Sequence, residues 1–146
     1  MKKFFALFAA LLMAATALSA RDKVYRNTSV LPEAARQVIA AAFPKTGVSH
    51  VKVDERTFGG NEYEVIFTDG SEIEFNSKGE WTDVDGGVRE VPSYFVLKPI
   101  AKYIKTNFKG AKIFKIEKDR NEYDVELSNG KELKFDRAGN FLRLDD

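Results

Sequence analysis

The residues best suited to chemistry in this sequence are carboxylates that alternate with other side chains along two stretches. Glu62, Glu64, Glu72 and Glu74 illustrate the spacing in the first stretch. Paired carboxylates can act as general acid and base, or they can bind a divalent cation. An acid catalyst, however, needs a pocket that raises its pKa, whereas carboxylates on an open strand face stay hydrated. The pattern therefore favours a polar surface over a catalytic pair.

Other catalytic and metal-binding groups are scarce. His50 is the single histidine, there is no cysteine, and no serine lies in a G-x-S-x-G elbow. A Ser-His-acid triad and a zinc site of nitrogen and sulfur ligands therefore lack their parts. Residues 83–87, DVDGG, look like the start of a calcium loop but lack its further oxygen ligands and its closing Glu. We predict no catalytic residue, no cofactor and no metal site.

An internal repeat carries these carboxylates. Residues 61–85 read NEYEVIFTDGSEIEFNSKGEWTDVD, and residues 121–145 read NEYDVELSNGKELKFDRAGNFLRLD. The two stretches agree at nine of 25 positions without a gap, and their turn glycines fall in register. Such self-similarity indicates a duplication.

Each copy predicts four antiparallel strands. Tyr63, Val65 and Phe67 alternate with polar residues, which is the period of a half-buried strand. The dipeptide at 69–70, Asp-Gly, then favours a tight hairpin turn, and the alternation resumes after it. The second copy repeats this order with Asn-Gly at 129–130.

A helical pattern precedes each set of strands, at 32–44 and at about 99–110, and Pro99 indicates that the second helix either starts there or is kinked there. We predict an α+β fold, a tandem repeat of a helix plus four strands, with the helices on one face of a curved antiparallel sheet. The first repeat would span 21–87 and the second 88–146, the two forming one body.

Residues 1–20 have the layout of a secretory signal peptide. Two lysines precede an apolar stretch at 4–15, and small residues follow, so that cleavage after Ala17, Ser19 or Ala20 fits the pattern. The apolar stretch is shorter than the roughly 20 residues of a membrane-spanning helix. We expect a periplasmic or secreted protein with no membrane span after cleavage.

The charge balance of the mature chain is close to zero. Without the two lysines of the signal peptide, 21 basic residues stand against 22 acidic ones, a net charge of −1. Near neutrality argues against nucleic acid or an anionic membrane as a partner. Because the chain has no cysteine, its stability depends on a packed core without disulfides.

One face of the predicted sheet is expected to carry no helix. If Tyr63 and its alternating neighbours face the helices, the residues between them face away. Such a charged face is commonly just solvated. The alternative is a docking surface, because Ile66 and Trp81 would be apolar anchors among charges. The candidate partner-binding residues are Glu62, Glu64, Ile66, Glu72, Glu74, Glu122, Asp124, Glu126, Glu132 and Lys134.

The repeated pattern E-Y-[DE]-V-x-[FL]-[ST]-[DN]-G-x-E-[IL]-x-F-[DN]-x-x-G-x-[FW] resembles the PepSY-like family. The resemblance covers nearly all of the mature chain and departs from the family at 93–98, where extra residues precede the second helix. It implies a small secreted or periplasmic protein whose fold is likened to the beta-lactamase inhibitor protein, which binds through its open sheet face. It implies no known activity and supplies no catalytic residues.

Three functions remain open from the sequence. The first is a non-catalytic, inhibitor-like binding module for an unknown envelope protein, acting as a monomer or weak dimer. The second is a binder of a small molecule or a divalent cation through the acidic cluster. The third is a hydrolase, which would need a closed pocket containing His50 and a carboxylate. We predict that the protein is not an enzyme.

Overall fold

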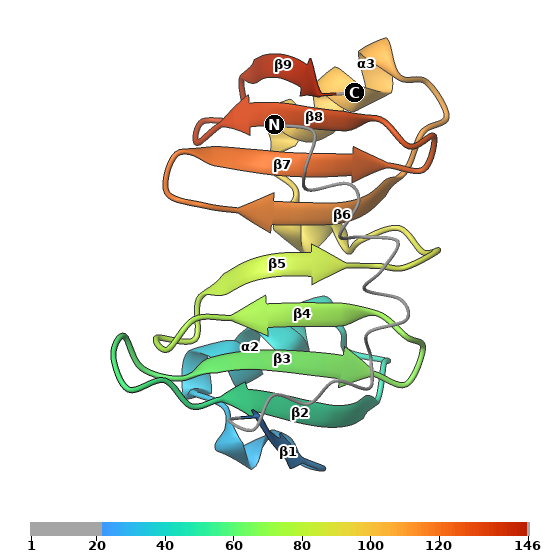
Figure 1. Ribbon diagram of the computed structural model, residues 1–146. Coiled ribbons are helices and arrows are strands. Elements are labelled where there is room, and N and C mark those ends of the chain that lie inside the picture. The colour runs from blue at the N-terminus through green and yellow to red at the C-terminus, as the bar shows by residue number, and fades with distance from the viewer. Residues whose placement is uncertain (1–21, 146) are drawn as a thin grey trace.

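The structure, a computed structural model, describes residues 22–145. The predicted signal peptide lies outside the described residues. Nine strands form a single antiparallel sheet in which each strand pairs with the next one along the chain (Figure 1). The strands are β1 (Asp22–Tyr25), β2 (Val48–Asp54), β3 (Glu62–Phe67), β4 (Glu72–Phe75), β5 (Trp81–Asp85), β6 (Ile113–Lys118), β7 (Glu122–Leu127), β8 (Glu132–Asp136) and β9 (Phe141–Asp145).

Two α-helices, α2 (Glu33–Ala42) and α3 (Lys98–Asn107), lie behind this sheet in Figure 1. The predicted α+β fold with an antiparallel sheet is therefore confirmed. The sequence predicted eight strands. The ninth is β1, which precedes the first helix in the sequence and pairs with β2, the strand that follows that helix. α2 precedes β2 to β5 and α3 precedes β6 to β9, while the duplication itself stays a prediction from the sequence.

The second helix starts close to its proline. α3 begins at Lys98 and places Pro99 in its first turn. A proline fits there because the first N–H groups of a helix have no partner within the helix. The residues before it form a separate 3₁₀ turn, η2 (Ser93–Phe95), which follows Pro92. A similar turn, η1 (Thr28–Val30), precedes α2.

Corresponding hairpin turns use the same hydrogen bonds in the two copies. The Oδ1 atom of Asp69 accepts the N–H of Ser71 at 2.9 Å, and the Oδ1 atom of Asn129 accepts the N–H of Lys131 at 3.1 Å. The glycine inside each turn has a φ of 88° and 84°, respectively, a left-handed conformation that glycine adopts without strain. The Asp-Gly and Asn-Gly pairs thus fix the register of both hairpins.

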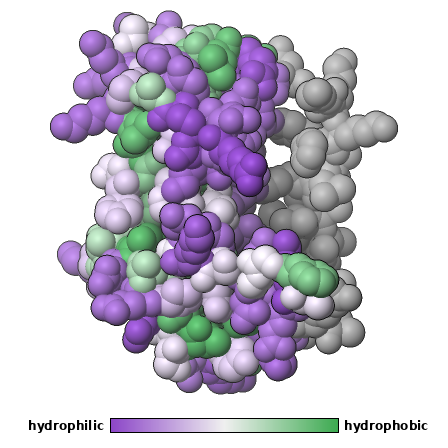
Figure 2. Space-filling model, turned by 90° about the vertical axis from the view of Figure 1, so that its left-hand side faces the viewer, coloured by the Kyte–Doolittle hydropathy of each residue, from purple (hydrophilic) through white to green (hydrophobic). Residues whose placement is uncertain are grey.

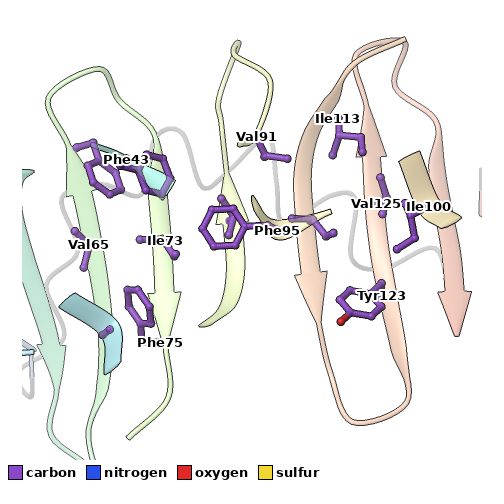
Figure 3. Close-up of a cluster of buried hydrophobic side chains, with 14 of the residues drawn as sticks. Phe43, Val65, Ile73, Phe75, Val91, Phe95, Ile100, Ile113, Tyr123 and Val125 are labelled. Carbon is purple, nitrogen blue, oxygen red and sulfur yellow. The ribbon is translucent and has the colours of Figure 1, made fainter. Parts of the chain in front are cut away.

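The hydrophobic core lies between the sheet and the helices. Val65 and Val125 are fully buried, as the alternation of both copies predicts. Figure 3 shows side chains of this cluster from strands and helices of both copies. The largest fully buried side chains are Phe67, Phe75, Phe135, Ile73, Ile100, Ile116, Leu127, Leu133, Val51, Val53 and Val84.

Aromatic rings join the two copies across the middle of the core. The ring of Phe95 in η2 lies 5.9 Å from that of Phe43 and 5.2 Å from that of Trp81. Trp81 in turn lies 6.3 Å from Tyr123 of β7. The prediction that Trp81 is an anchor on the open face is therefore wrong. A register shift between β4 and β5 pairs it with the buried Phe75, on the helix side.

Candidate partner-binding face

The side of the sheet away from the helices is defined here as the open face. Strand pairing from β3 to β8 places twelve carboxylates and two lysines on it, with Ile66 as an apolar member. All ten residues predicted from the sequence belong to this set. Its members are Glu62, Glu64, Ile66, Glu72, Glu74, Asp83, Asp85, Lys115, Glu117, Glu122, Asp124, Glu126, Glu132, Lys134 and Asp136.

Five of these carboxylates form one line across neighbouring strands, called the acidic row below. In the strand pairings, each of them stands directly opposite the next. At about 4.8 Å between strands, a row that crosses β3 to β7 is about 19 Å long. Like charges directly opposite each other destabilise a sheet, so this line costs stability wherever no cation neutralises it. The acidic row consists of Glu64, Glu74, Asp83, Glu117 and Asp124.

Two members of the acidic row, Asp83 and Glu117, were missed by the sequence analysis. Asp83 was considered only as the start of an incomplete calcium loop, although Asp83-Val84-Asp85 and Lys115-Ile116-Glu117 both alternate as strands do. The pairing of β5 with β6 brings the two copies together and sets Asp83 opposite Glu117. That pairing joins the two halves of the acidic row.

Crowding raises the pKa of several carboxyls on the open face. Partial burial, together with the neighbouring negative charge of Glu64, raises the pKa of Glu72 to about 7. Partial burial and the charges of Asp83 and Glu64 raise the pKa of Glu74 to about 7, although this side chain still reaches solvent. Burial also raises the pKa of Asp83 to about 6, against the opposing effect of Lys115. Near neutral pH, Glu72 and Glu74 are therefore partly protonated.

Lysines neutralise the acidic row at three places. The Nζ atom of Lys52 lies 3.4 Å from Glu64 at one end, and that of Lys134 lies 2.5 Å from Asp124 at the other. Between them, the Nζ atom of Lys115 lies 3.2 Å from Asp83, with both side chains less than a fifth exposed. Within the described residues, the Oδ1 atom of Asp124 is buried without a hydrogen-bond partner. This oxygen can still accept a hydrogen bond.

A hydrolase would need a closed pocket that contains His50 and a carboxylate. A hollow of about 400 Å³ lies over β1 to β5 and includes Glu64, Glu74 and Lys52, but His50 does not line it. His50 instead lies 3.1 Å from the hydroxyl of Ser49. Between residues 22 and 145, no group of three or more acidic or histidine side chains is arranged to hold a metal ion. The acidic row is a long, shallow surface rather than a pocket.

The side of the molecule that bears the β2–β3, β4–β5, β6–β7 and β8–β9 loops has a different character. Figure 2 shows it as mostly hydrophilic, with hydrophobic spots that stay separate from one another. A docking surface is expected to combine apolar anchors with a polar rim. The open face therefore remains the candidate surface for a partner.

Comparisons with known proteins identify the family of this chain and solved structures that are similar to it. Residues 61–143 match the family described as "Putative beta-lactamase-inhibitor-like, PepSY-like". A putative periplasmic protein of unknown function from Bacteroides vulgatus is 44% identical, with a TM-score of 0.80, over 86% of this chain and 99% of its own. No curated protein matches the sequence.

Two further solved structures have the same TM-score of 0.80. One is a putative calcium-regulated periplasmic protein from Bacteroides thetaiotaomicron, 38% identical over 86% of this chain and 97% of its own. The other is a putative periplasmic protein from the DUF2874 family of Bacteroides vulgatus, 39% identical over 88% of this chain and 100% of its own.

The localisation predicted from the sequence, periplasmic or secreted, is confirmed, and the protein is periplasmic like these relatives. In the part of the chain that the structure describes, neither helix has the length and apolar character needed to cross a membrane.

Proposed function

The chain belongs to the PepSY-like family, and from that premise we propose that it is a non-catalytic periplasmic binding module whose open face takes a protein partner. The observation that carries the proposal is the acidic row. Five carboxylates stand in line where like charges cost stability. A surface that is costly for the fold alone is explained if a partner neutralises it.

The partner that fits this surface is a protein with a basic contact region. Lysine or arginine side chains spaced along a strand or loop would neutralise the acidic row over its length of about 19 Å. Ile66 supplies an apolar contact beside the row, opposite Glu72. The length of the acidic row, which crosses five strands, favours a macromolecule over a small ligand, because two of its members, Glu64 and Glu74, line the hollow over β1 to β5 and the other three do not. The family's likeness to a beta-lactamase inhibitor is compatible with an inhibitor-like use of this face.

Removing the charge of the acidic row should abolish partner binding. The variant E64Q/E74Q/D83N/E117Q keeps the shape of the side chains and removes four charges. We expect this variant to retain at least roughly tenfold less purified partner than the unmutated mature protein does. High salt should reduce partner binding by the unmutated protein to a similar extent. The partner is first identified by affinity capture from periplasmic extract, and binding is then measured with both proteins purified.

The matched control removes four carboxylates that lie outside the open face. The variant E33Q/E55Q/E80Q/E90Q changes the net charge by the same amount and should retain full binding. Equal binding by the two variants would show that the open face is not the docking surface. A loss of binding in both would indicate a general effect of net charge, which also contradicts the proposal.

Divalent-cation binding is the second candidate, and one comparison favours it. A relative that is 38% identical is described as a putative calcium-regulated periplasmic protein. Burial and neighbouring carboxylates raise the pKa of Glu72 and Glu74, and a cation beside them would relieve the second of these two effects. Against this stands the absence, within residues 22–145, of a cluster arranged for a metal ion.

Calorimetry with calcium chloride at pH 7.5 tests this second candidate. Cation binding should give a saturable heat and a rise in Tm, and both should be lost in E72Q/E74Q. A flat titration removes calcium as a ligand and leaves the protein-binding proposal untouched. Magnesium serves as the comparison, because it demands a stricter octahedral geometry than calcium does.

A further inference from the structure

The helix α3 carries a line of lysines on its outer side, called the lysine stripe below. Lys98, Lys102 and Lys105 follow one another at intervals of four and three residues, which places them on one face of α3, and Lys109 lies in the turn just after the helix ends at Asn107. All four are exposed. Between Glu90 and the next acidic residue in the sequence, at position 117, there is no aspartate or glutamate. The stripe is therefore a patch of one sign of charge.

The lysine stripe contributes little to holding the fold together, apart from Lys105, which lies in the last turn of α3, where a cation is favourable. Among residues 22–145, its four lysines take part in no ion pair. Like charges three or four residues apart also weaken a helix. The helix α2, which precedes the strands of the first copy, has the sequence EAARQVIAAA and contains no lysine. The fold thus accepts a helix in this role without a basic face.

An apolar groove of about 520 Å³ opens beside the lysine stripe. It lies between α3 and the segments before and after it. Lys105 lines the groove, so a cation stands directly next to apolar side chains. Glu90 and Ser93 also line it. The apolar lining residues are Val91, Val96, Ala101, Ile104, Phe108, Ala111 and Ile113.

The charges of the molecule are separated between its two sides. The twelve carboxylates of the open face lie on the front of the sheet in Figure 1, whereas α3 lies behind it. A net charge near zero therefore hides an acidic open face and a local basic patch at α3. The argument from composition against an anionic surface does not hold for the face that α3 presents.

We propose that the α3 side docks onto an anionic phospholipid surface, with the lysine stripe on the headgroup phosphates and the groove on an acyl chain. A cation beside an apolar groove matches an anionic amphiphile. The open face of a second copy matches less well, because it offers mainly carboxylates, with Ile66 and the exposed Val24 as its apolar contacts among the described strands β1 to β8. The protein is periplasmic and so faces membranes. Docking through α3 would turn the open face away from the lipid and toward a partner.

Vesicle co-sedimentation of the purified mature protein tests the proposal. At low salt, the protein should bind vesicles that contain phosphatidylglycerol and phosphatidylcholine, and it should not bind phosphatidylcholine alone. The variant K98Q/K102Q/K105Q/K109Q should weaken binding by roughly tenfold or more, because each lysine contributes near an anionic surface. Salt at 0.5 M should have the same effect. The Tm of this variant should not fall, since like charges have been removed from a helix.

Two controls separate the lysine stripe and the groove from general charge. R26Q/K45Q/K78Q/R120Q removes four exposed cations elsewhere and should retain vesicle binding. Ala101→Glu places a negative charge in the groove and should weaken binding several-fold, whereas Ala41→Glu, at an exposed position of α2, should not.

Three outcomes would overturn the lipid proposal. The first is the absence of binding to vesicles that contain phosphatidylglycerol. The second is equal binding by the two quadruple variants. The third is self-association in light scattering that needs the lysine stripe, together with no vesicle binding, which would assign the stripe to the open face of a second copy. The binding test with the purified partner is independent of all three.

Discussion

Replacing Phe95 with alanine should lower the free energy of unfolding by about 3–5 kcal/mol. The side chain is 2% exposed and lies in the aromatic cluster that joins the two copies. Its removal leaves a cavity between Phe43 and Trp81, which belong to the first copy. Trp81 then lacks a packing neighbour on one side, which weakens its contact with Tyr123 of the second copy. Denaturation with urea, followed by tryptophan fluorescence and circular dichroism, measures the change.

Tyr94→Ala is the matched control for this experiment. Tyr94 belongs to the same 3₁₀ turn and packs edge-on against Phe95 at 5.1 Å, but its side chain is 54% exposed. Its removal should cost no more than about 1 kcal/mol. Both variants should unfold in a single transition, because the cluster makes the two copies one cooperative unit. A cost below about 1 kcal/mol for Phe95→Ala, or two separate transitions in the unmutated protein, would contradict this account of the core.

The protein should become more stable as the pH falls from 8 to about 5, by about 1–3 kcal/mol. The folded-state pKa of Glu72 is raised from 4.5 to about 7, and that of Asp83 from 3.8 to about 6. Between these folded and unfolded values, the native state binds more protons than the unfolded state. The free energy of unfolding therefore declines as the pH rises through this window. Urea unfolding at a series of pH values measures it.

The trend should reverse below about pH 4. Hydrogen bonds from Ser71 lower the pKa of Asp69, and backbone hydrogen bonds lower that of Asp119. These carboxylates stabilise the native state only while they are charged, so protonation removes their contribution. The most stable pH should thus lie near 5.

A single substitution tests whether the open face causes this pH dependence. Glu72→Gln removes one of the raised groups, so it should stabilise the protein at pH 8 and flatten the slope between pH 8 and 5. Glu33→Gln, at the exposed start of α2, should change neither. A stability that rises with pH from 5 to 8 in the unmutated protein would contradict the crowding of carboxyls on the open face.

Local patterns in the sequence predict most of the fold. Tyr63, Val65 and Phe67 alternate because one side of β3 is buried, and the Asp-Gly at 69–70 sets the hairpin that follows. The same signals recur in the second copy. β1 escaped prediction because it has four residues, Asp22–Tyr25, and its pattern becomes a strand only through pairing with β2.

The candidate site was predicted only in part, and the reason lies in long-range pairing. The hairpin of the first copy places Glu64 beside Glu74, and the alternation along β7 places Glu122 on the same face of the sheet. Period two alone predicts both positions. Asp83 and Glu117 meet through the β5–β6 pairing, which spans a helix and leaves no local signal. Trp81 was assigned to the wrong face because a register shift between β4 and β5 cannot be seen in the alternation of a single strand.

The sequential strand order has a consequence for how the chain folds after export. Every strand pairs only with its neighbours along the chain, and six of the eight pairings join strands that are connected without a helix between them. Sheets built from such local partners have a small loop-closure cost and tend to fold fast for their class. With no cysteine, no oxidative step delays the process. A chain that emerges unfolded on the far side of a membrane can therefore acquire its structure hairpin by hairpin, without oxidases or isomerases of disulfides.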